Sequence, residues 1–358
     1  MEGLVINQSF WKGKRVFVTG HTGFKGGWIC LWLRQLGVEV IGYSLEPATM
    51  PSLFDAADVG EGMQSIIGDI RDHAKLSKAI SESKPDVVIH MAAQPLVRYS
   101  YAQPAETYEV NVMGMVYLLE GVRATPSVKA VVNVTSDKCY ENREWIWGYR
   151  ENEAMGGSDP YSSSKGCAEL VTSAYRQSFF ESAGIALASA RAGNVIGGGD
   201  WAADRLIPDF LRAMDAGETL TLRSPLAVRP WQHVLEPLSG YLMLAEQLYS
   251  NGASFAEGWN FGPSDDDWRT VSWIIERMAE MHKDIYWQCD EMPQLHEANL
   301  LKLDSSKARH QLNWQPRWRL QTALQKTLEW HEAWRNAEDM RAVSLAQIND
   351  YQSTVRGD

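Results

Sequence analysis

The chain has 358 residues, with 45% hydrophobic and 22% charged residues and a formal net charge of −11 at pH 7. These values are typical of a globular protein that is large enough for two domains. The acidic charge argues against binding to nucleic acid or to anionic membranes, because both partners require a basic surface.

The cysteines and the apolar segments indicate the compartment. Cys30, Cys139, Cys167 and Cys289 are scattered, without the spacing of a disulfide framework or of a metal site, so no metal is expected. The first residues lack the apolar stretch of a signal peptide, and no later segment reaches transmembrane length. We therefore expect a cytoplasmic protein.

Strand-like and helical patterns alternate from residue 15 onward. In chain order, strands are expected at 15–20, 38–44, 63–70, 85–93, 128–136 and 185–197, and helices at 24–37, 72–83, 106–124 and 161–184. Strands separated by helices of this length imply right-handed crossovers and a parallel sheet. The sequence thus predicts an α/β fold, a doubly wound Rossmann parallel sheet followed by a smaller carboxy-terminal α/β domain.

The regular alternation ends near residue 190, where the glycine-rich segment "GGGDW" begins a stretch of shorter elements. We expect residues 1–190 to form a dinucleotide-binding domain. Residues 191–358 are expected to form mainly a substrate domain, with some elements returning to the first.

The segment "TGHTGFKG" places Gly20, Gly23 and Gly26 between a strand and a helix that begins near Phe24. At such a turn the free N–H groups of the helix can bind a pyrophosphate. Gly20 permits the tight turn, Gly23 the approach of the phosphates, and Gly26 close packing of the helix on the strand. These glycines and Phe24 therefore predict a dinucleotide site.

The second strand indicates which dinucleotide binds. Its end, at Ser44, lacks the acidic residue usual for NAD, but no lysine or arginine for an NADP phosphate occurs between Gln35 and Ile70. Glu46 would repel that phosphate, so NAD is expected, with Ser44 near the ribose. NADP remains an alternative cofactor, because the Lys25 side chain could reach its 2′-phosphate.

Later strand ends complete the expected cofactor site. Asp69 is expected to accept a hydrogen bond from the adenine amino group, next to Ile70. Ala92 and Ala93 are small enough to leave room for the cofactor, and Thr135 ends a further strand beside it.

Tyr161 and Lys165 in "YSSSK" stand four residues apart, on one face of the predicted helix. A free tyrosine has a pKa near 10, too high for a base at neutral pH. A lysine ammonium together with a nicotinamide cation favours the phenolate and should lower the pKa of Tyr161. We expect a catalytic pair, with Lys165 also binding the nicotinamide ribose.

Five segments, "TGHTGFKG", "HMAAQ", "NVTSDKCY", "YSSSK" and "SARAGNVIGGGDW", together resemble the extended short-chain dehydrogenase/reductase superfamily. The resemblance covers nearly the whole chain. Within the superfamily it is strongest to the nucleotide-sugar 4,6-dehydratases, in the branch that acts on CDP-glucose. It implies CDP-glucose as substrate, NAD as cofactor, and a homodimer or a dimer of dimers.

The resemblance also implies roles for the segment that follows Thr135. Ser136 would hydrogen-bond the reacting sugar hydroxyl, and Asp137 would protonate the departing 6-hydroxyl. Lys138 stands where most dehydratases have a glutamate. It could remove the C5 proton, or it could only stabilise the enolate while another group takes that proton.

The family's substrate positions match Asn194, Arg229 and Asn260, and Arg205 is a further candidate for the sugar diphosphate.

Two other functions remain open at this point. A nucleotide-sugar 4-epimerase would share the oxidation by Tyr161, although Asp137 and Lys138 argue against it. A non-catalytic NAD-sensing protein could use the same fold.

Overall fold

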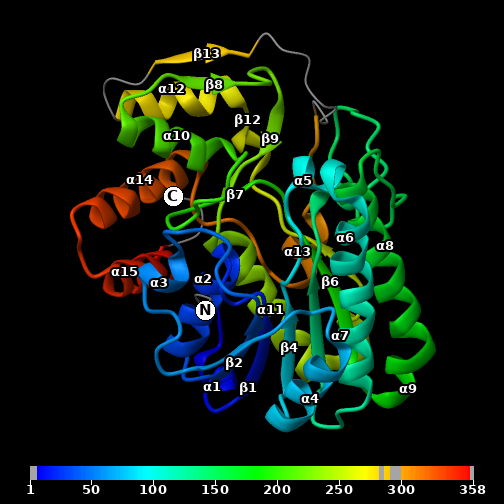
Figure 1. Cartoon of the computed structure of the whole chain (residues 1–358). Coiled ribbons are helices and arrows are strands. Elements are labelled where there is room, and N and C mark those ends of the chain that lie inside the picture. Colours follow the sequence, from blue (N-terminus) through cyan, green and yellow to red (C-terminus); the bar gives the residue numbers. More distant parts are fainter. Residues whose placement is uncertain (1–5, 282–285, 291–299, 355–358) are drawn as a thin grey trace.

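A computed structural model describes residues 6–281, 286–290 and 300–354 (Figure 1). Its central sheet consists of seven strands: β1 (Arg15–Thr19), β2 (Glu39–Ser44), β3 (Gln64–Ile67), β4 (Val87–His90), β5 (Ala130–Val134), β6 (Ala186–Arg191) and β11 (Gly258–Asn260). They lie in the order β11-β6-β5-β4-β1-β2-β3, and every neighbouring pair is parallel. The predicted doubly wound parallel sheet is confirmed.

Helices cover both faces of this sheet: α2 (Phe24–Gln35), α4 (His73–Ser83), α6 (Pro104–Tyr108), α7 (Gly114–Arg123), α8 (Pro160–Tyr175) and α11 (Leu235–Asn251). Successive strand residues point to opposite faces. Val16 and Val18 of β1 join the core formed with α2 and α11, whereas Phe17 joins the core formed with α4 and α7. Both faces of the sheet are therefore buried, as the nearly continuous apolar strands require.

The two long helices expected from the sequence are continuous but contain wider turns. A π-helical turn at Glu109–Met113 joins α6 to α7, and another at Arg176–Phe180 joins α8 to α9 (Glu181–Ala183). Helix α8 begins at Pro160 because the Asp159 side chain accepts a hydrogen bond from the backbone N–H of Ser162. This cap places Tyr161 in the first turn of the helix.

The remaining elements are the strands β7 (Val195–Ile196), β8 (Leu220–Leu222), β9 (Val228–Pro230), β10 (Gln232–His233), β12 (Trp268–Thr270) and β13 (Trp287–Cys289) and the helices α1 (Gln8–Trp11), α3 (Leu53–Ala56), α5 (Val97–Ala102), α10 (Leu206–Ala216), α12 (Val271–Met281), α13 (Ser306–Gln311), α14 (Leu320–Arg335) and α15 (Met340–Ser353). Helices α10, α12 and α14 enclose a separate apolar core. In Figure 1 they lie with β8, β9, β12 and β13 at the carboxyl ends of the sheet strands.

Three elements of the second half of the chain return to the sheet. Strand β11 pairs with β6, α11 covers one sheet face, and α15 packs against α2. The division into residues 1–190 and 191–358 stays a proposal, with these returning elements as its exceptions. Among the described helices, none is long and apolar enough to cross a membrane.

Candidate active site

One large cavity of about 710 Å³ lies between the carboxyl ends of the sheet strands and the part of the chain that carries α10, β8 and β9. It brings together nearly all residues proposed from the sequence. Its lining includes Gly20, Gly23, Phe24, Gly26, Ser44, Asp69, Ile70, Ala92, Ala93, Thr135, Ser136, Asp137, Lys138, Tyr161, Lys165, Asn194, Arg205 and Arg229. Parallel α/β sheets bind their ligands at this edge.

The glycine loop is shaped for a pyrophosphate. Gly20 has a φ of +77°, which favours glycine, and a Cβ at Gly26 would lie 1.9 Å from the carbonyl oxygen of Gly20. Gly23 caps α2 without a side chain, so the first N–H groups of this helix face the cavity uncovered by any side-chain cap. These features fit a dinucleotide.

The end of the cavity beside β2 and β3 is acidic. Its lining between residues 43 and 70 includes Glu46 and Asp69, and this sequence interval contains no lysine or arginine. Thr22 Oγ1 lies 2.9 Å from Ser44 Oγ and donates to the carbonyl oxygen of Leu45 at 2.8 Å, which fixes the end of β2. A 2′-phosphate would meet no cation in this stretch of the lining and would be repelled by Glu46, whereas a ribose hydroxyl would not be repelled.

Asp69 differs from its expected state. Arg71 donates to both carboxylate oxygens, with Nη2 2.6 Å from Oδ2 and the backbone N–H 2.8 Å from Oδ1. The side-chain bond to Arg71 lowers the pKa of Asp69 below its ordinary value. Asp69 lines the cavity, but an adenine amino group would have to share a carboxylate that Arg71 already holds.

Lys25 also differs from its expected position. Its charged neighbours are Arg205, Lys165, Asp137 and Asp200, all at the catalytic end of the cavity. Burial, with the charges of Arg205 and Lys165, lowers the pKa of Lys25 to about 8. The alternative that Lys25 binds an NADP phosphate is therefore wrong for this structure, because the side chain interacts away from Ser44.

The segment after β5 forms a short 3₁₀ turn, Asp137–Cys139, capped by Ser136. Ser136 Oγ donates to Asp137 Oδ1 at 2.9 Å and accepts from the backbone N–H of Lys138 at 3.2 Å. Asp137 is 2% exposed, and its Oδ2 has no hydrogen-bond partner among the described residues. A buried carboxylate oxygen without a partner is costly, so this atom is a strong candidate for contact with a ligand.

A glycine makes room for this carboxylate. A Cβ at Gly193 would lie 2.0 Å from Asp137 Oδ2. Any side chain at position 193 would therefore displace the carboxylate. Gly193 is a site residue that the sequence did not identify, since only the fold brings it next to Asp137.

Tyr161 lies beside Ser136, and its phenol is buried in the same cavity. Burial raises the pKa of Tyr161 to about 12, although Ser136 and Arg205 act in the opposite direction. Without the cofactor, Lys165 and the other nearby cations therefore do not lower the pKa of Tyr161, and the lowering expected with a bound nicotinamide stays a prediction. The desolvation of the phenolate outweighs the nearby cations, and Lys165 Nζ lies 5.9 Å from the phenol ring centre.

Lys165 is buried as well, and burial lowers its pKa to about 8, while Cys139 and Glu169 act to raise it. Arg205, only a weak candidate in the sequence, pairs with the buried Asp200 at 2.8 Å and interacts electrostatically with Tyr161. Lys25, Asp200 and Arg205 thus belong to the end of the cavity that carries Tyr161. Lys25, placed two positions after Gly23 in the glycine loop, was the signal in the sequence that could have indicated this.

The substrate candidates divide into two groups. Arg229, 7% exposed, and Asn194 line the cavity. Asn260 does not: it is fully buried, and its side-chain amide donates to the carbonyl oxygens of Tyr149 and Asp304. The predicted substrate contact of Asn260 is therefore wrong, because the side chain is used to join two distant loops.

A cofactor cradle, a buried Tyr-Lys pair and a serine–carboxylate–lysine turn in one cavity are features of a dinucleotide-dependent enzyme of the extended short-chain dehydrogenase/reductase class. Comparisons with known proteins narrow this class. The family described as GDP-mannose 4,6 dehydratase matches residues 17–327. A CDP-glucose 4,6-dehydratase of Salmonella typhimurium is 58% identical, over 98% of this chain and 99% of the relative.

Solved structures share the fold. The dTDP-glucose 4,6-dehydratase of Bacillus anthracis, in complex with NAD, has a TM-score of 0.75 at 22% identity and covers 91% of this chain and 99% of its own. DesIV, a dTDP-glucose 4,6-dehydratase from Streptomyces venezuelae with NAD and TYD bound, has a TM-score of 0.77 at 23% identity, with the same coverage. The chain belongs to the nucleotide-sugar 4,6-dehydratase family, and the resemblance stated from its sequence is confirmed.

Proposed function

We propose that this nucleotide-sugar 4,6-dehydratase acts on CDP-glucose, with NAD as its cofactor, and releases CDP-4-keto-6-deoxyglucose and water. The 58% identical relative carries that name over nearly the same length. The observation that carries the proposal within the structure is the turn Ser136–Asp137–Lys138, which faces the same cavity as Tyr161. It supplies the acid that an elimination needs and a simple 4-epimerization does not.

The cofactor residues follow from the shape of the cavity. The N-terminus of α2 and the glycine loop would hold the pyrophosphate, Ser44 the adenosine ribose, and Lys165 the nicotinamide ribose. Ala92, Ala93 and Thr135 leave space at the carboxyl ends of β4 and β5. Held there, NAD would supply a hydride acceptor for C4 of the sugar and, once reduced, a hydride donor for C6.

Tyr161 starts the reaction by taking the proton of the sugar 4-hydroxyl, which Ser136 orients. Since burial raises the pKa of Tyr161 to about 12, the phenolate needs more positive charge than the protein alone provides. A bound nicotinamide cation would add positive charge, and Lys165 adds its ammonium group. The product of this step is a 4-ketone.

The ketone makes the C5 hydrogen acidic, so water can be eliminated across C5 and C6. Asp137 donates its proton to the departing 6-hydroxyl through the oxygen that lacks a partner among the described residues. Lys138, half-buried on the same turn, either removes the C5 proton or stabilises the enolate. A Lys138→Met variant separates the two roles, because elimination at a rate near that of the wild type would rule out the first.

The diphosphate of the substrate requires local cations in an acidic protein. We place it near Arg229 and Arg205, where a guanidinium can bind two phosphate oxygens, with Asn194 close by. Arg98 and Arg223 also line the cavity, and each pairs with Asp204.

We further infer that the protein works in the cytoplasm, where its four free cysteines stay reduced.

The oligomeric state is proposed to be a dimer, built on the face that carries α5, α6, α7 and α8 (Figure 1). Large apolar side chains are exposed along these elements, among them Tyr99, Tyr108, Met113 and Leu170. Leu170→Glu should convert the dimer to a monomer in sedimentation measurements. The matched control is Ile146→Glu, an exposed apolar residue in a different loop, which should leave the mass unchanged.

Substrate choice is tested by incubating the protein with CDP-, GDP-, UDP- and dTDP-hexoses and measuring the alkaline absorbance of 4-keto sugars. We expect product from CDP-glucose alone. Release of a 4-epimer without loss of water would identify a 4-epimerase instead. A 4-keto product from another nucleotide sugar would preserve the dehydratase and reject CDP-glucose.

A further inference from the structure

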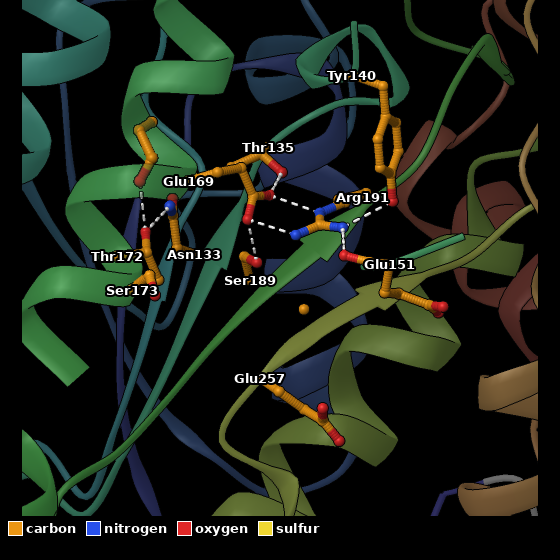
Figure 2. Close-up of polar contacts among 12 residues, drawn as sticks. Asn133, Thr135, Tyr140, Glu151, Glu169, Thr172, Ser173, Ser189, Arg191 and Glu257 are labelled. Carbon is orange, nitrogen blue, oxygen red and sulfur yellow. Dashed lines mark hydrogen bonds and ion pairs between the residues drawn. The ribbon is translucent and has the colours of Figure 1, made fainter. Parts of the chain in front are cut away.

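A buried ion pair lies one turn beyond Lys165 along α8, outside the first cavity. Arg191 donates to both carboxylate oxygens of Glu169, from Nε to Oε1 and from Nη2 to Oε2, each at 2.8 Å (Figure 2). Each side chain is only 5% exposed. Both residues line a second cavity of about 540 Å³, and neither lines the catalytic one.

Three hydroxyl groups complete this polar cluster, which we define as Glu169, Arg191, Thr135, Ser189 and Tyr140. Thr135 Oγ1 donates to Glu169 Oε1, and Ser189 Oγ donates to Glu169 Oε2, each at 2.6 Å. Arg191 Nη1 donates to the Tyr140 hydroxyl at 2.6 Å. Figure 2 shows these side chains converging from β6, α8 and the segment after β5.

The polar cluster holds the catalytic turn at both ends. Thr135 directly precedes Ser136, and Tyr140 follows Lys138 by two positions. One end is therefore bonded to Glu169 and the other to Arg191. Since these two residues are bonded to each other, the ion pair links the two ends of the turn, in addition to the backbone bonds from Thr135 to Ala190 and from Asp137 to Ala192.

The same ion pair fixes the catalytic helix and the neighbouring loop. Glu169 follows Lys165 by four positions and Tyr161 by eight, so the three share one face of α8. Arg191 ends β6 two positions before Gly193, whose backbone packs against the Asp137 carboxylate. The polar cluster thus connects the supports of Tyr161, Lys165 and Asp137.

Stability alone does not account for this arrangement. Removing two charges from water costs nearly as much as their attraction returns, and apolar residues of similar size often replace a buried ion pair without loss. A chain that needed only stability at this position would not need the pair. The catalytic turn, by contrast, needs an accurate position, because a displacement of about 1 Å can reduce a rate about a hundredfold.

We propose that Glu169 and Arg191 are positioning residues that hold the turn Ser136–Lys138 in register with Tyr161 for the proposed dehydration. Neither needs to touch the substrate. Displacement of the turn should slow the chemical steps and leave nucleotide-sugar binding nearly unchanged, since the candidate diphosphate residue Arg229 lies in a different part of the fold, on β9.

Two hydroxyl deletions test the proposal. Tyr140→Phe removes the bond that ties the turn to Arg191 and also the 2.7 Å bond from the Tyr140 hydroxyl to Asn260 Oδ1, whereas Ser189→Ala removes one short bond within the polar cluster that does not involve the turn. Both side chains are 1% exposed, and the loss in thermal unfolding should be larger in Tyr140→Phe, which removes two bonds. We expect kcat to fall about tenfold in Tyr140→Phe with KM within about twofold, and to stay within about twofold in Ser189→Ala.

If Tyr140→Phe does not fold, a second pair of variants, at Thr135, tests the same proposal. Thr135→Val removes the other bond to the turn, whereas Thr135→Ser keeps the hydroxyl and should restore kcat. The proposal is overturned if kcat falls equally in Tyr140→Phe and Ser189→Ala, or if Thr135→Ser loses as much as Thr135→Val. The wild type is measured first with the nucleotide sugar that it converts, so a wrong substrate assignment is detected separately.

Discussion

Asp137 and Glu169 are two buried carboxylates near α8, and they are in opposite situations. Asp137 is 2% exposed, and its Oδ2 lacks a partner among the described residues. Glu169 is equally buried, but Arg191, Thr135 and Ser189 occupy both of its oxygens. Burial alone would raise the pKa of Glu169, yet Arg191 and the hydroxyl groups outweigh burial, and the pKa lies below its ordinary value.

The difference separates a carboxylate whose two oxygens are both occupied from one with an oxygen left for another partner. Glu169 is held ionised by its neighbours, so it can fix positions but cannot act as an acid at neutral pH. Asp137 has one buried oxygen without a partner among the described residues, which is consistent with the contact to a ligand proposed above. Two carboxylates with similar burial thus acquire different tasks from their partners.

Removing the acid should have the largest effect. In Asp137→Asn the amide cannot donate a proton to the departing hydroxyl, so we expect formation of the 4-keto product to fall by about a hundredfold or more. The measurement is kcat from the alkaline absorbance of the product. Because no ion pair is broken, unfolding in urea should change by less than about 1 kcal/mol. A rate within about fivefold of the wild type would exclude Asp137 as the acid.

Neutralising the paired carboxylate should instead affect folding. Glu169→Gln leaves Arg191 buried without its counter-charge, and we expect the free energy of unfolding to fall by about 3–5 kcal/mol. Glu257→Gln is the control, because Glu257 lines the same second cavity and pairs with Lys307 at 2.9 Å but is 48% exposed. Its loss should stay below about 1 kcal/mol. Equal losses of unfolding free energy in Glu169→Gln and Glu257→Gln, measured in urea, would contradict the difference between a buried and an exposed ion pair.

A third buried carboxylate extends the comparison to pH. Glu236 accepts hydrogen bonds from the backbone N–H groups of Arg317 and Trp318 and from the Tyr351 hydroxyl. Burial raises the pKa of Glu236 to about 7. Neutral donors therefore do not offset desolvation here as Arg191 does at Glu169.

The sign of the pH effect follows from this shift. Between pH 4.5 and 7 the folded protein binds the Glu236 proton and the unfolded chain has lost it, so this contribution to stability falls as the pH rises through that range. Glu236→Gln removes the dependence. Relative to the wild type, the variant should gain about 2 kcal/mol in unfolding free energy between pH 5 and pH 7.5. If the unfolding free energies of the variant and the wild type differ by the same amount at pH 5 and at pH 7.5, Glu236 does not titrate in this range.

Features set by local spacing could be predicted from the sequence. The glycine loop and the Tyr161–Lys165 pair each lie within one short segment. The family resemblance added Ser136, Asp137 and Lys138, and the cavity contains all of these residues. The alternation of strands and helices was sufficient to predict the parallel sheet. Strand β11 is the exception, since three residues give too little pattern to be recognised.

Features that depend on distant partners could not be predicted. Asn260 looked like a substrate ligand because its amide partners, the backbone carbonyls of Tyr149 and Asp304, become neighbours only in the fold. The raised pKa of Tyr161 depends on burial, which spacing does not reveal. The pairing of Glu169 with Arg191 likewise required the packing of α8 against β6.

The central claim is that hydrogen moves within one sugar, from C4 to C6. It is tested most directly by converting CDP-glucose that carries deuterium at C4 and locating the label by NMR and mass spectrometry. The account predicts deuterium in the new C6 methyl group of the 4-keto product. Deuterium in the solvent, or an unlabelled methyl group, would contradict it.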